Sequence, residues 1–292
     1  MQTQTEKVTA VSTISGYLDT HEYPAKLFEI PGLVRLLQWI NGIVTLRNWY
    51  VRKFLRRTIS SLPRNFTLLD AGCGMGDYTF YCAKHFPDST VVGVDDSNSS
   101  IQIANTVARN IGLRNVTFLK EDLMHLVLSR RFDVVLCNSV LHSIQEDELV
   151  LRNLSRILGD DGKLVLYVPV RHKRYLPKFE RLEERHLTRF FHRYSDEFGY
   201  HKYSKEEIKS KMERNGLAVE EQYFSYGVFG GVAFELYSLL LVLMKKLPSS
   251  LFAVVAVCYA ITVFPVQLIL MLLDFITPKR EGNGTLIIAR RA

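Results

Sequence analysis

The chain has 292 residues, of which 47% are hydrophobic and 23% are charged, and its formal net charge is +7. These values exclude an intrinsically disordered chain, and the length allows one large domain with additions, or two domains. Four cysteines without ligand spacing point to neither a metal site nor a disulfide framework, and the N-terminus lacks the charge and apolar order of a signal peptide. We therefore expect a protein of the cytoplasm.

The first 60 residues predict a disordered start followed by a helical cap. Residues 1 to about 15 are polar, and apolar residues recur at helical spacing between positions 27 and 60. Pro31 and Gly32 predict a break at the start of this region.

Basic residues gather in two stretches. Between Lys26 and Arg57 seven basic residues accompany a single acid, Glu29, and a second basic stretch runs from Arg171 to Arg193. Such a surface suits the phosphates of lipid headgroups or of nucleic acid, but ordinary solvated helix faces have the same composition.

Apolar runs separated by helical stretches follow from residue 61. The runs that predict strands are Phe66–Asp70, Thr90–Asp95, Val116–Asp122, Phe132–Ser139, Gly162–Val170, Leu217–Phe224 and Gly284–Arg291. Strands that are apolar throughout and alternate with helices predict a mainly parallel sheet covered on both faces, which is an α/β fold. Ser97 or Asn98 should cap one helix, and Ser204 with Glu207 forms a capping box before another.

A glycine loop follows the first predicted strand, in the sequence LLDAGCGMGDY. Gly72, Gly74 and Gly76 would let the backbone approach a ligand closely at the carboxyl edge of the sheet. A dinucleotide-binding fingerprint would require glycine at position 77, where this chain has Asp77, so an NAD site is disfavoured. Asp95 ends the second strand, where an acid can bind two ribose hydroxyls.

These motifs together resemble a class I S-adenosylmethionine-dependent methyltransferase. LLDAGCGMG, VVGVDDS, FLKEDL, FDVVLCNSVLHSI and GKLVLYVPV occur in that family's order and spacing, over about residues 60 to 225 plus the last strand. The resemblance implies a seven-stranded Rossmann-like sheet in the order 3-2-1-4-5-7-6, with the last strand antiparallel. It also implies S-adenosyl-L-methionine as the cofactor.

The resemblance also implies which residues bind that cofactor. They are Asp70, Gly72, Gly74, Gly76, Asp95, Asp96, Asp122, Leu123 and Asn138. The glycines and the acid before them would hold the methionine part, and Asp95 or its neighbour Asp96 would hold the ribose. Asp122 and Leu123 would meet the adenine ring, and Asn138 would line the site near the methyl group.

Methyl transfer to an alcohol or phenol benefits from a general base. His142, just after the fourth strand, is the best-placed candidate, although a histidine here can also line the cofactor site or serve the structure. His192 is a weaker candidate within a basic stretch, 171–203, that we expect to form a lid. The residues expected to face the acceptor are His201, Tyr203 and Tyr226.

An apolar insert, residues 226–283, separates the sixth and seventh strands. From Leu251 to Leu273 it has no charged residue and could pass for a membrane span. Because both its ends belong to one sheet, a single crossing is excluded. A crossing hairpin, with Gly227–Met244 as its other arm, would carry two lysines to the far side and place Glu235 in the apolar layer.

Helices lying in the plane of the membrane interface fit this insert better. Glu235, Ser238 and Lys245 form a narrow polar stripe on the first helix, and a weaker stripe ends at Asp274 on the second, which Pro265 should kink. A crossing hairpin, and a soluble dimer or core contact, remain alternatives. In each case the insert would rise beside the cofactor site.

The expected organisation is a disordered segment and cap (1–60), a methyltransferase core (61–225), the apolar insert (226–283) and the last strand (284–292). The expected activity is methyl transfer to a hydrophobic or lipid-like small molecule, most simply onto oxygen. The alternatives are carbon methylation of a quinone or aromatic polyketide ring, and a membrane-attached binding module without turnover. We expect the protein to lie on the inner face of the membrane, and a homodimer is compatible with the sequence. We expect no nucleic-acid partner, because no RNA-binding motif is present.

Overall fold

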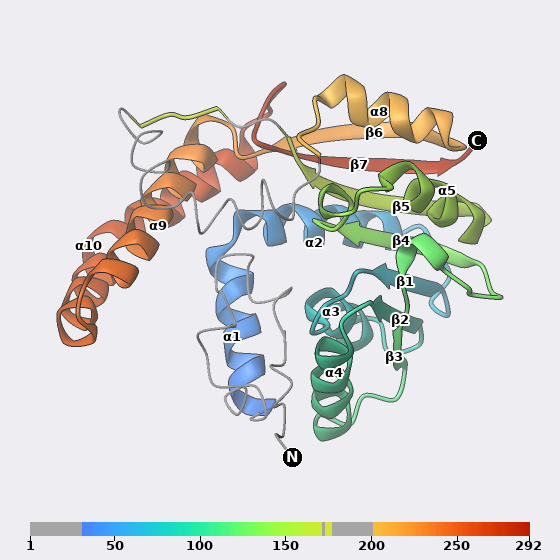
Figure 1. Cartoon of the computed structure of the whole chain (residues 1–292), viewed down its shortest axis with the longest axis horizontal. Coiled ribbons are helices and arrows are strands. Elements are labelled where there is room, and N and C mark those ends of the chain that lie inside the picture. The colour runs from blue at the N-terminus through green and yellow to red at the C-terminus, as the bar shows by residue number, and fades with distance from the viewer. Residues whose placement is uncertain (1–30, 171–172, 177–200) are drawn as a thin grey trace, which may run out of the picture.

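A computed structural model describes residues 31–170, 173–176 and 201–292 of the chain. Seven strands form one sheet in the order β3-β2-β1-β4-β5-β7-β6 (Figure 1). They are β1 Thr67–Ala71, β2 Thr90–Asp95, β3 Val116–Lys120, β4 Phe132–Asn138, β5 Leu158–Pro169, β6 Leu217–Ser225 and β7 Gly284–Arg291. Strand β7 runs antiparallel to both β5 and β6, and the pairs formed among β1 to β5 are parallel. The fold expected from the sequence is therefore confirmed.

Helices cover both faces of this sheet. Those of the core are α3 Asp77–His85, α4 Asn98–Asn110, α5 Asp147–Ile157 and α8 Lys205–Arg214, with single turns η4 Leu123–His125 and η5 Leu141–Ser143. Successive strand residues point to opposite faces. On β1, Leu69 packs in one cluster with α5 and α8, whereas Leu68 packs in another with α3. Both predicted caps are present, because Ser97 Oγ accepts from Ser100 N and the capping box forms at the start of α8.

Two N-terminal helices, α1 Pro31–Val44 and α2 Leu46–Ile59, precede the sheet. Helix α1 begins at Pro31 and includes Gly32, so Gly32 does not break it, and residues 27–30 lie outside the described ranges. Proline suits the first helical position because its φ is already fixed and its missing N–H would have no partner there. A break within this region falls at Thr45, between α1 and α2, where the backbone is extended and the Thr45 hydroxyl donates to Asn41 Oδ1 at 2.7 Å.

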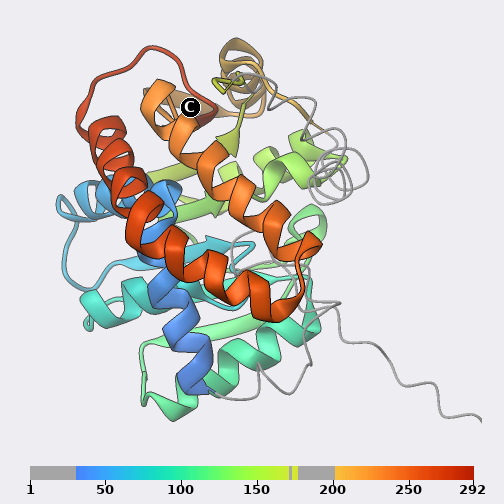
Figure 2. The ribbon, with the colours of Figure 1, turned by 90° about the vertical axis from the view of Figure 1, so that its left-hand side faces the viewer.

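The insert forms two packed helices, α9 Val228–Lys246 and α10 Ser249–Ile276, which lie side by side in Figures 1 and 2. It leaves the sheet at Ser225 and returns at Gly284, and these two residues pair across β6 and β7. Its two ends are therefore neighbours in the sheet. By length and composition α10 is the one helix among the described residues that could cross a membrane, which alone is weak evidence.

The polar residues of the insert point inward. Glu235, Ser238, Gln267 and Asp274 are all buried, at 2% exposure or less. If these polar stripes were the water-facing sides of interfacial helices, they would be exposed. The predicted orientation of the stripes is therefore wrong. The protein itself satisfies them, since Glu235 accepts hydrogen bonds from Tyr175 N at 2.9 Å and Leu176 N at 2.7 Å. Many apolar side chains of α10 consequently face outward.

Three expectations concern residues outside the described ranges. They are the disordered start of the chain, most of the lid (171–203) and the candidate base His192.

Candidate active site

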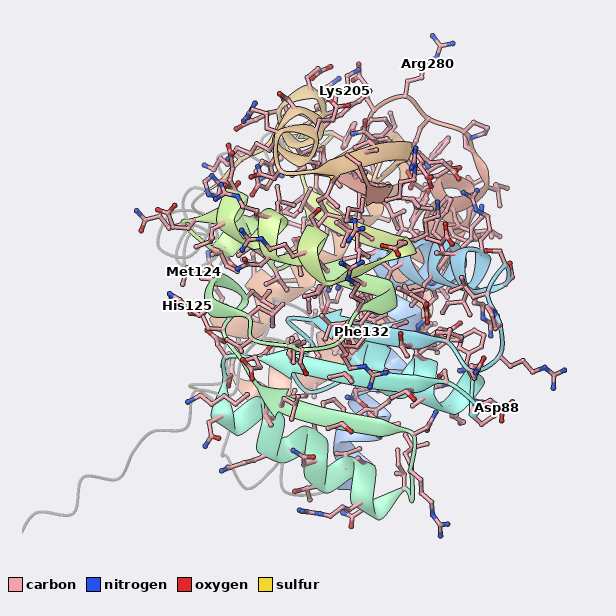
Figure 3. All side chains as sticks on the ribbon, turned by 90° about the vertical axis from the view of Figure 1, so that its right-hand side faces the viewer. Asp88, Met124, His125, Phe132, Lys205 and Arg280 are labelled. Atoms are coloured by element: carbon pink, nitrogen blue, oxygen red, sulfur yellow. The ribbon has the colours of Figure 1, made fainter. Side chains whose placement is uncertain are left out.

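The candidate site lies at the edge where the parallel strands end. Figure 3 shows Met124 and His125, which follow β3, on one side of the sheet and Asp88, which precedes β2, on the other. The glycine loop, Asp95 and Asn138 follow or end β1, β2 and β4, so they share the first of these edges. Open α/β sheets bind ligands at this edge.

The loop after β1 has a backbone that only glycine adopts easily. Gly72, Gly74 and Gly76 have φ values of +78°, +53° and +89°. The amides of Gly72 and Cys73 both donate to Val94 O at 2.8 Å, which fixes the loop against β2. A Cβ atom on Gly72 would lie 2.3 Å from a methyl group of Val140, so the loop admits no side chain there.

Asp95 is joined directly to this loop. Its Oδ2 accepts from Gly74 N at 2.8 Å and its Oδ1 accepts from Ser97 N at 3.0 Å, and the residue is only 6% exposed. Burial raises the pKa of Asp95, and the two backbone donors counter that effect. Asp96 is exposed to solvent. The geometry therefore favours Asp95 over Asp96 as the ligand of the ribose hydroxyls.

Asp70, at the end of β1, is buried and turned toward α3. Its Oδ2 accepts from the Thr79 hydroxyl at 2.6 Å. Burial raises the pKa of Asp70 to about 7, in spite of this hydrogen bond. The carboxyl group is therefore part ionised near neutral pH, and its ionisation opposes folding.

Replacing Asp70 with asparagine should stabilise the protein more at pH 8 than at pH 5. The folded pKa lies above the unfolded value, so the folded state binds the extra proton and wild-type stability falls as pH rises from about 4 to 7. The penalty above pH 7 is at most about 4 kcal/mol. Denaturant unfolding of both proteins should show the advantage of Asp70→Asn growing by about 2 kcal/mol between pH 5 and pH 8. Asp161→Asn, at an exposed position, should show no such growth, and a pH-independent difference for Asp70→Asn would refute the prediction.

The side chain of Asp122 accepts hydrogen bonds at the end of β3, whereas the side chain of Leu123 is buried in the core. Asp122 Oδ1 accepts from Met124 N at 2.8 Å, and its Oδ2 lies 2.9 Å from His125 Nδ1. Desolvation alone would raise the pKa of Asp122, but these two hydrogen bonds lower it overall. The Leu123 side chain is buried in the core, so only its backbone is placed to meet an adenine ring.

The end of β4 carries an unusual pair of residues. Asn138 Oδ1 is buried and has no hydrogen-bond partner within the described part of the chain. Ser139, which follows it, has a φ of +56°, a strained value for a residue other than glycine. Such a combination at a sheet edge is typical of a ligand site.

Arg47 was missed as a site residue, because it lies in a basic run that also fits a solvated helix. Its Nη1 donates to Ser139 Oγ at 2.9 Å, and its backbone N donates to the Tyr226 hydroxyl at 3.1 Å. Among the described residues, Tyr226 is the other non-glycine residue with positive φ, at +55°. Arg47 thus links the end of β4 to the start of the insert, and nothing in the local sequence signals this long-range contact.

Tyr78, Tyr167 and Tyr226 lie close enough to Arg47 for its charge to affect them. Burial is the main cause that raises the pKa of all three phenols, and Arg47 only partly offsets it. They stay protonated at neutral pH and are poor candidates for a general base.

The histidines expected near the acceptor lie beside one another. His142 is half-buried in η5, and its carbonyl accepts from His201 N at 3.2 Å. The His201 ring stacks on Tyr203, with centroids 5.5 Å apart. Tyr203 itself is fully buried, and its hydroxyl donates to Asp147 Oδ2 at 2.7 Å. Tyr203 therefore has a structural role in place of the acceptor contact suggested by the sequence.

These residues fit S-adenosylmethionine. The glycine loop bears no side chain at Gly72, Gly74 and Gly76, Asp95 offers a carboxylate beside it, and Asn138 offers a buried oxygen with its hydrogen-bonding capacity unused within the described part of the chain. On a 3-2-1-4-5-7-6 sheet, this arrangement defines a class I S-adenosylmethionine-dependent methyltransferase. The family model described as a methyltransferase domain matches residues 62–216, more than half of the chain, and the chain belongs to this family. The protein is an enzyme, and S-adenosylmethionine is its cofactor.

Curated relatives match over the core. A malonyl-[acyl-carrier protein] O-methyltransferase of Bacillus cereus is 39% identical over 98 residues, 34% of this chain and 35% of the relative. A demethylmenaquinone methyltransferase of Lactobacillus johnsonii is 29% identical over 130 residues, 43% of this chain and 52% of the relative. A probable (S)-tetrahydroprotoberberine N-methyltransferase 2 of Papaver bracteatum is 28% identical over 118 residues, 40% of this chain and 33% of the relative. The chain thus spans about a third to a half of the length of these relatives.

Solved structures share the fold at low identity. A geranyl diphosphate methyltransferase in complex with the cofactor aligns with a TM-score of 0.52 at 17% identity, over 82% of this chain and 84% of that one. The [4+2]-cyclase SpnF aligns with a TM-score of 0.53, also at 17% identity, over 82% and 80% of the two chains. These likenesses support the architecture, and they say nothing about the acceptor.

Proposed function

We propose that the enzyme methylates an oxygen atom of a hydrophobic, lipid-like small molecule. One observation carries this proposal: the insert starts at the carboxyl end of β6, on the cofactor side of the sheet, and presents an apolar outer surface. Arg47 ties the base of the insert, at Tyr226, to Ser139 beside the expected methyl position. An acceptor drawn from an apolar phase would meet the site there.

The cofactor supplies a methyl group that is already activated on a sulfonium centre. The remaining task of the protein is to position the acceptor, exclude water and remove a proton. His142 is our candidate for the proton acceptor, since the neighbouring phenols keep raised pKa values. A phenol, an enol or a carboxyl group would each suit such a site.

His142→Ala should lower kcat for an oxygen acceptor by roughly 100-fold and leave cofactor affinity within about twofold. The reason is that a general base acts on the acceptor hydroxyl in the transition state, whereas cofactor binding rests on the loop and Asp95. The measurement is steady-state kinetics together with calorimetric titration of the cofactor. His85→Ala, at an exposed position on α3, is the control and should match wild type. A full rate in His142→Ala would remove the residue from the mechanism.

A second candidate is carbon methylation of a quinone or aromatic ring, which the similarity to the demethylmenaquinone methyltransferase favours. The two bonds differ chemically, since mild alkali releases a methyl ester and hydrogen iodide cleaves a methyl ether, whereas a ring methyl group survives both treatments. Product stability and fragmentation therefore separate them. A cofactor-binding module without turnover would bind the cofactor and label nothing.

The test is to incubate the enzyme with methyl-labelled cofactor and a cell extract of its host, then separate lipids, proteins and nucleic acids. We expect label in the organic-solvent fraction. Label confined to RNA or protein would overturn the proposed acceptor class.

A further inference from the structure

Four of the helices seen in Figure 2, α1, α2, α9 and α10, are strongly biased in charge. The stretches 31–59 and 226–276 make up α1, α2, α9 and α10, and together they contain only two acids, Glu235 and Asp274. Both acids are buried and hydrogen-bonded inside the protein. No exposed acid remains in these stretches.

Helix α10 presents a continuous apolar ridge. Its exposed large apolar residues are Leu251, Val254, Val257, Ile261, Val266, Ile269, Leu272 and Ile276. They recur three to five positions apart, so they follow one side of the helix. The buried polar residues, Gln267 and Asp274, occupy the opposite side. A ridge of this length on a helix that water surrounds is unfavourable unless something covers it.

Helix α1, whose ribbon is visible beneath α10 in Figure 2, also has exposed apolar residues. Leu36 and Ile40 are exposed, and Trp39 is 65% exposed. Tryptophan favours the boundary between lipid and water, because its ring is apolar and its N–H is polar. Helices α1 and α10 thus both expose apolar side chains.

Cations border the ridge. Lys53 and Arg56 of α2 are exposed, and Lys53 Nζ lies 4.9 Å from the ring centre of Phe275 on α10. Arg280, four residues beyond the end of α10, projects into solvent in Figure 3. Lys246, at the end of α9, is also exposed. Each exposed cation near an anionic bilayer adds electrostatic attraction.

We propose that the α9–α10 hairpin docks on an anionic lipid bilayer, with α10 in the interfacial plane and its apolar ridge in the headgroup and acyl boundary. Crossing is disfavoured because Ser225 and Gly284 hold both ends in the sheet. Asp274 also fixes the C-terminal part of α10 to the body, accepting from Gly230 N at 3.1 Å and Tyr50 Oη at 3.0 Å. Docking requires no acceptor, so its failure and failure of the proposed function are distinguishable.

A second copy of the chain suits this surface less well. A symmetric dimer would place the same patch on both sides of the interface, so Lys53 and Arg56 of α2 would meet the same cations of the partner, and these four helices offer no exposed acid to pair with them. Anionic headgroups supply the missing charge.

Cys258 allows a direct test. It lies exposed on α10, and the three other cysteines of the chain are buried, so a thiol-reactive fluorophore should label it selectively. With the cofactor present and no acceptor, the emission should shift to the blue on adding phosphatidylglycerol-containing vesicles. The shift should be weak with pure phosphatidylcholine and should fall as salt rises. An unshifted emission with anionic vesicles would overturn the proposal.

Matched variants locate the contact. Ile261→Glu, on the ridge, should lower partitioning to anionic vesicles at least tenfold in a flotation assay. Val127→Glu, at a loop position that is 82% exposed after β3, makes the same type of change and should bind as wild type. Lys53→Glu should also weaken binding several-fold, and Arg130→Glu, exposed near Val127, should not. Equal vesicle binding by Ile261→Glu and Val127→Glu would refute the proposed contact between the ridge and the bilayer. The proposal would also fail if the wild type formed a dimer, did not bind vesicles, and dissociated when Ile261 was changed to Glu.

Discussion

Asp95→Ala should weaken S-adenosylmethionine binding by roughly 100-fold, the largest loss expected from any single change at the cofactor site. The Asp95 carboxylate is placed to accept hydrogen bonds from ribose hydroxyls, and hydrogen bonds to a charged group are the stronger kind. It also accepts from Gly74 N and Ser97 N, so its removal loosens the glycine loop as well. Calorimetric titration of the cofactor measures the effect.

The adjacent residue offers a matched control. Asp96→Ala removes the same charge one residue further along the chain, at an exposed position, and should change affinity by no more than about threefold. Equal losses in the two variants would mean that general electrostatic attraction explains the effect. A larger loss in Asp96→Ala would transfer the ribose assignment to that residue.

Asp274→Ala should destabilise the packing of the insert by about 3 kcal/mol. The Asp274 carboxylate is fully buried, and it accepts from Gly230 N, Tyr226 N and the Tyr50 hydroxyl. Lys279, whose Nζ lies 3.2 Å from Asp274 Oδ2, would lose the partner that compensates its burial. Breaking a buried pair from one side is strongly destabilising, because the remaining charge is left uncompensated.

Hydrogen exchange together with denaturant unfolding would show whether this loss is local. We expect faster exchange in α9 and α10 and a smaller change in the parallel strands. Glu213→Ala, which removes an exposed acid from α8, should leave both measurements unaltered. Wild-type protection of α9 and α10 in Asp274→Ala would show that the insert is held by its apolar contacts alone.

Asp274 and Arg47 join the insert to the cofactor site through one residue. Asp274 holds the Tyr226 amide at 3.2 Å, and the Tyr226 hydroxyl accepts from Arg47 N. The Arg47 guanidinium then reaches Ser139, next to Asn138. A short series of direct contacts therefore connects the insert to the residue that follows Asn138.

Much of this site could be predicted because its signals are local. Three glycines, an acid at the end of a strand and a serine before a helix each specify a conformation within a few residues, and Gly72, Asp95 and Ser97 adopt the geometry expected of them. The strand order came from the motif set as a whole. Tertiary packing had only to assemble these pieces.

Other features depended on distant partners. A buried acid and a solvated acid look alike in a helical stripe, and Glu235 is buried only because the backbone of residues 175 and 176 donates to it. The sequence alone allows Tyr203 to face an acceptor, whereas in the structure its hydroxyl donates a hydrogen bond to Asp147. Arg47 acquires its position from residues 92 and 179 places away in the chain. No period or spacing in the sequence encodes such contacts.

The central claim is that this methyltransferase acts on an acceptor held in the lipid phase. The most direct test is transfer of labelled methyl from S-adenosylmethionine to isolated membranes of the host, by wild type and by Asp95→Ala. We predict label in the solvent-extractable lipid fraction with wild type, and almost none with Asp95→Ala under cofactor concentrations that saturate only the wild type. Wild-type enzyme that binds the cofactor, leaves the lipid fraction unlabelled and methylates a water-soluble component instead would contradict the account.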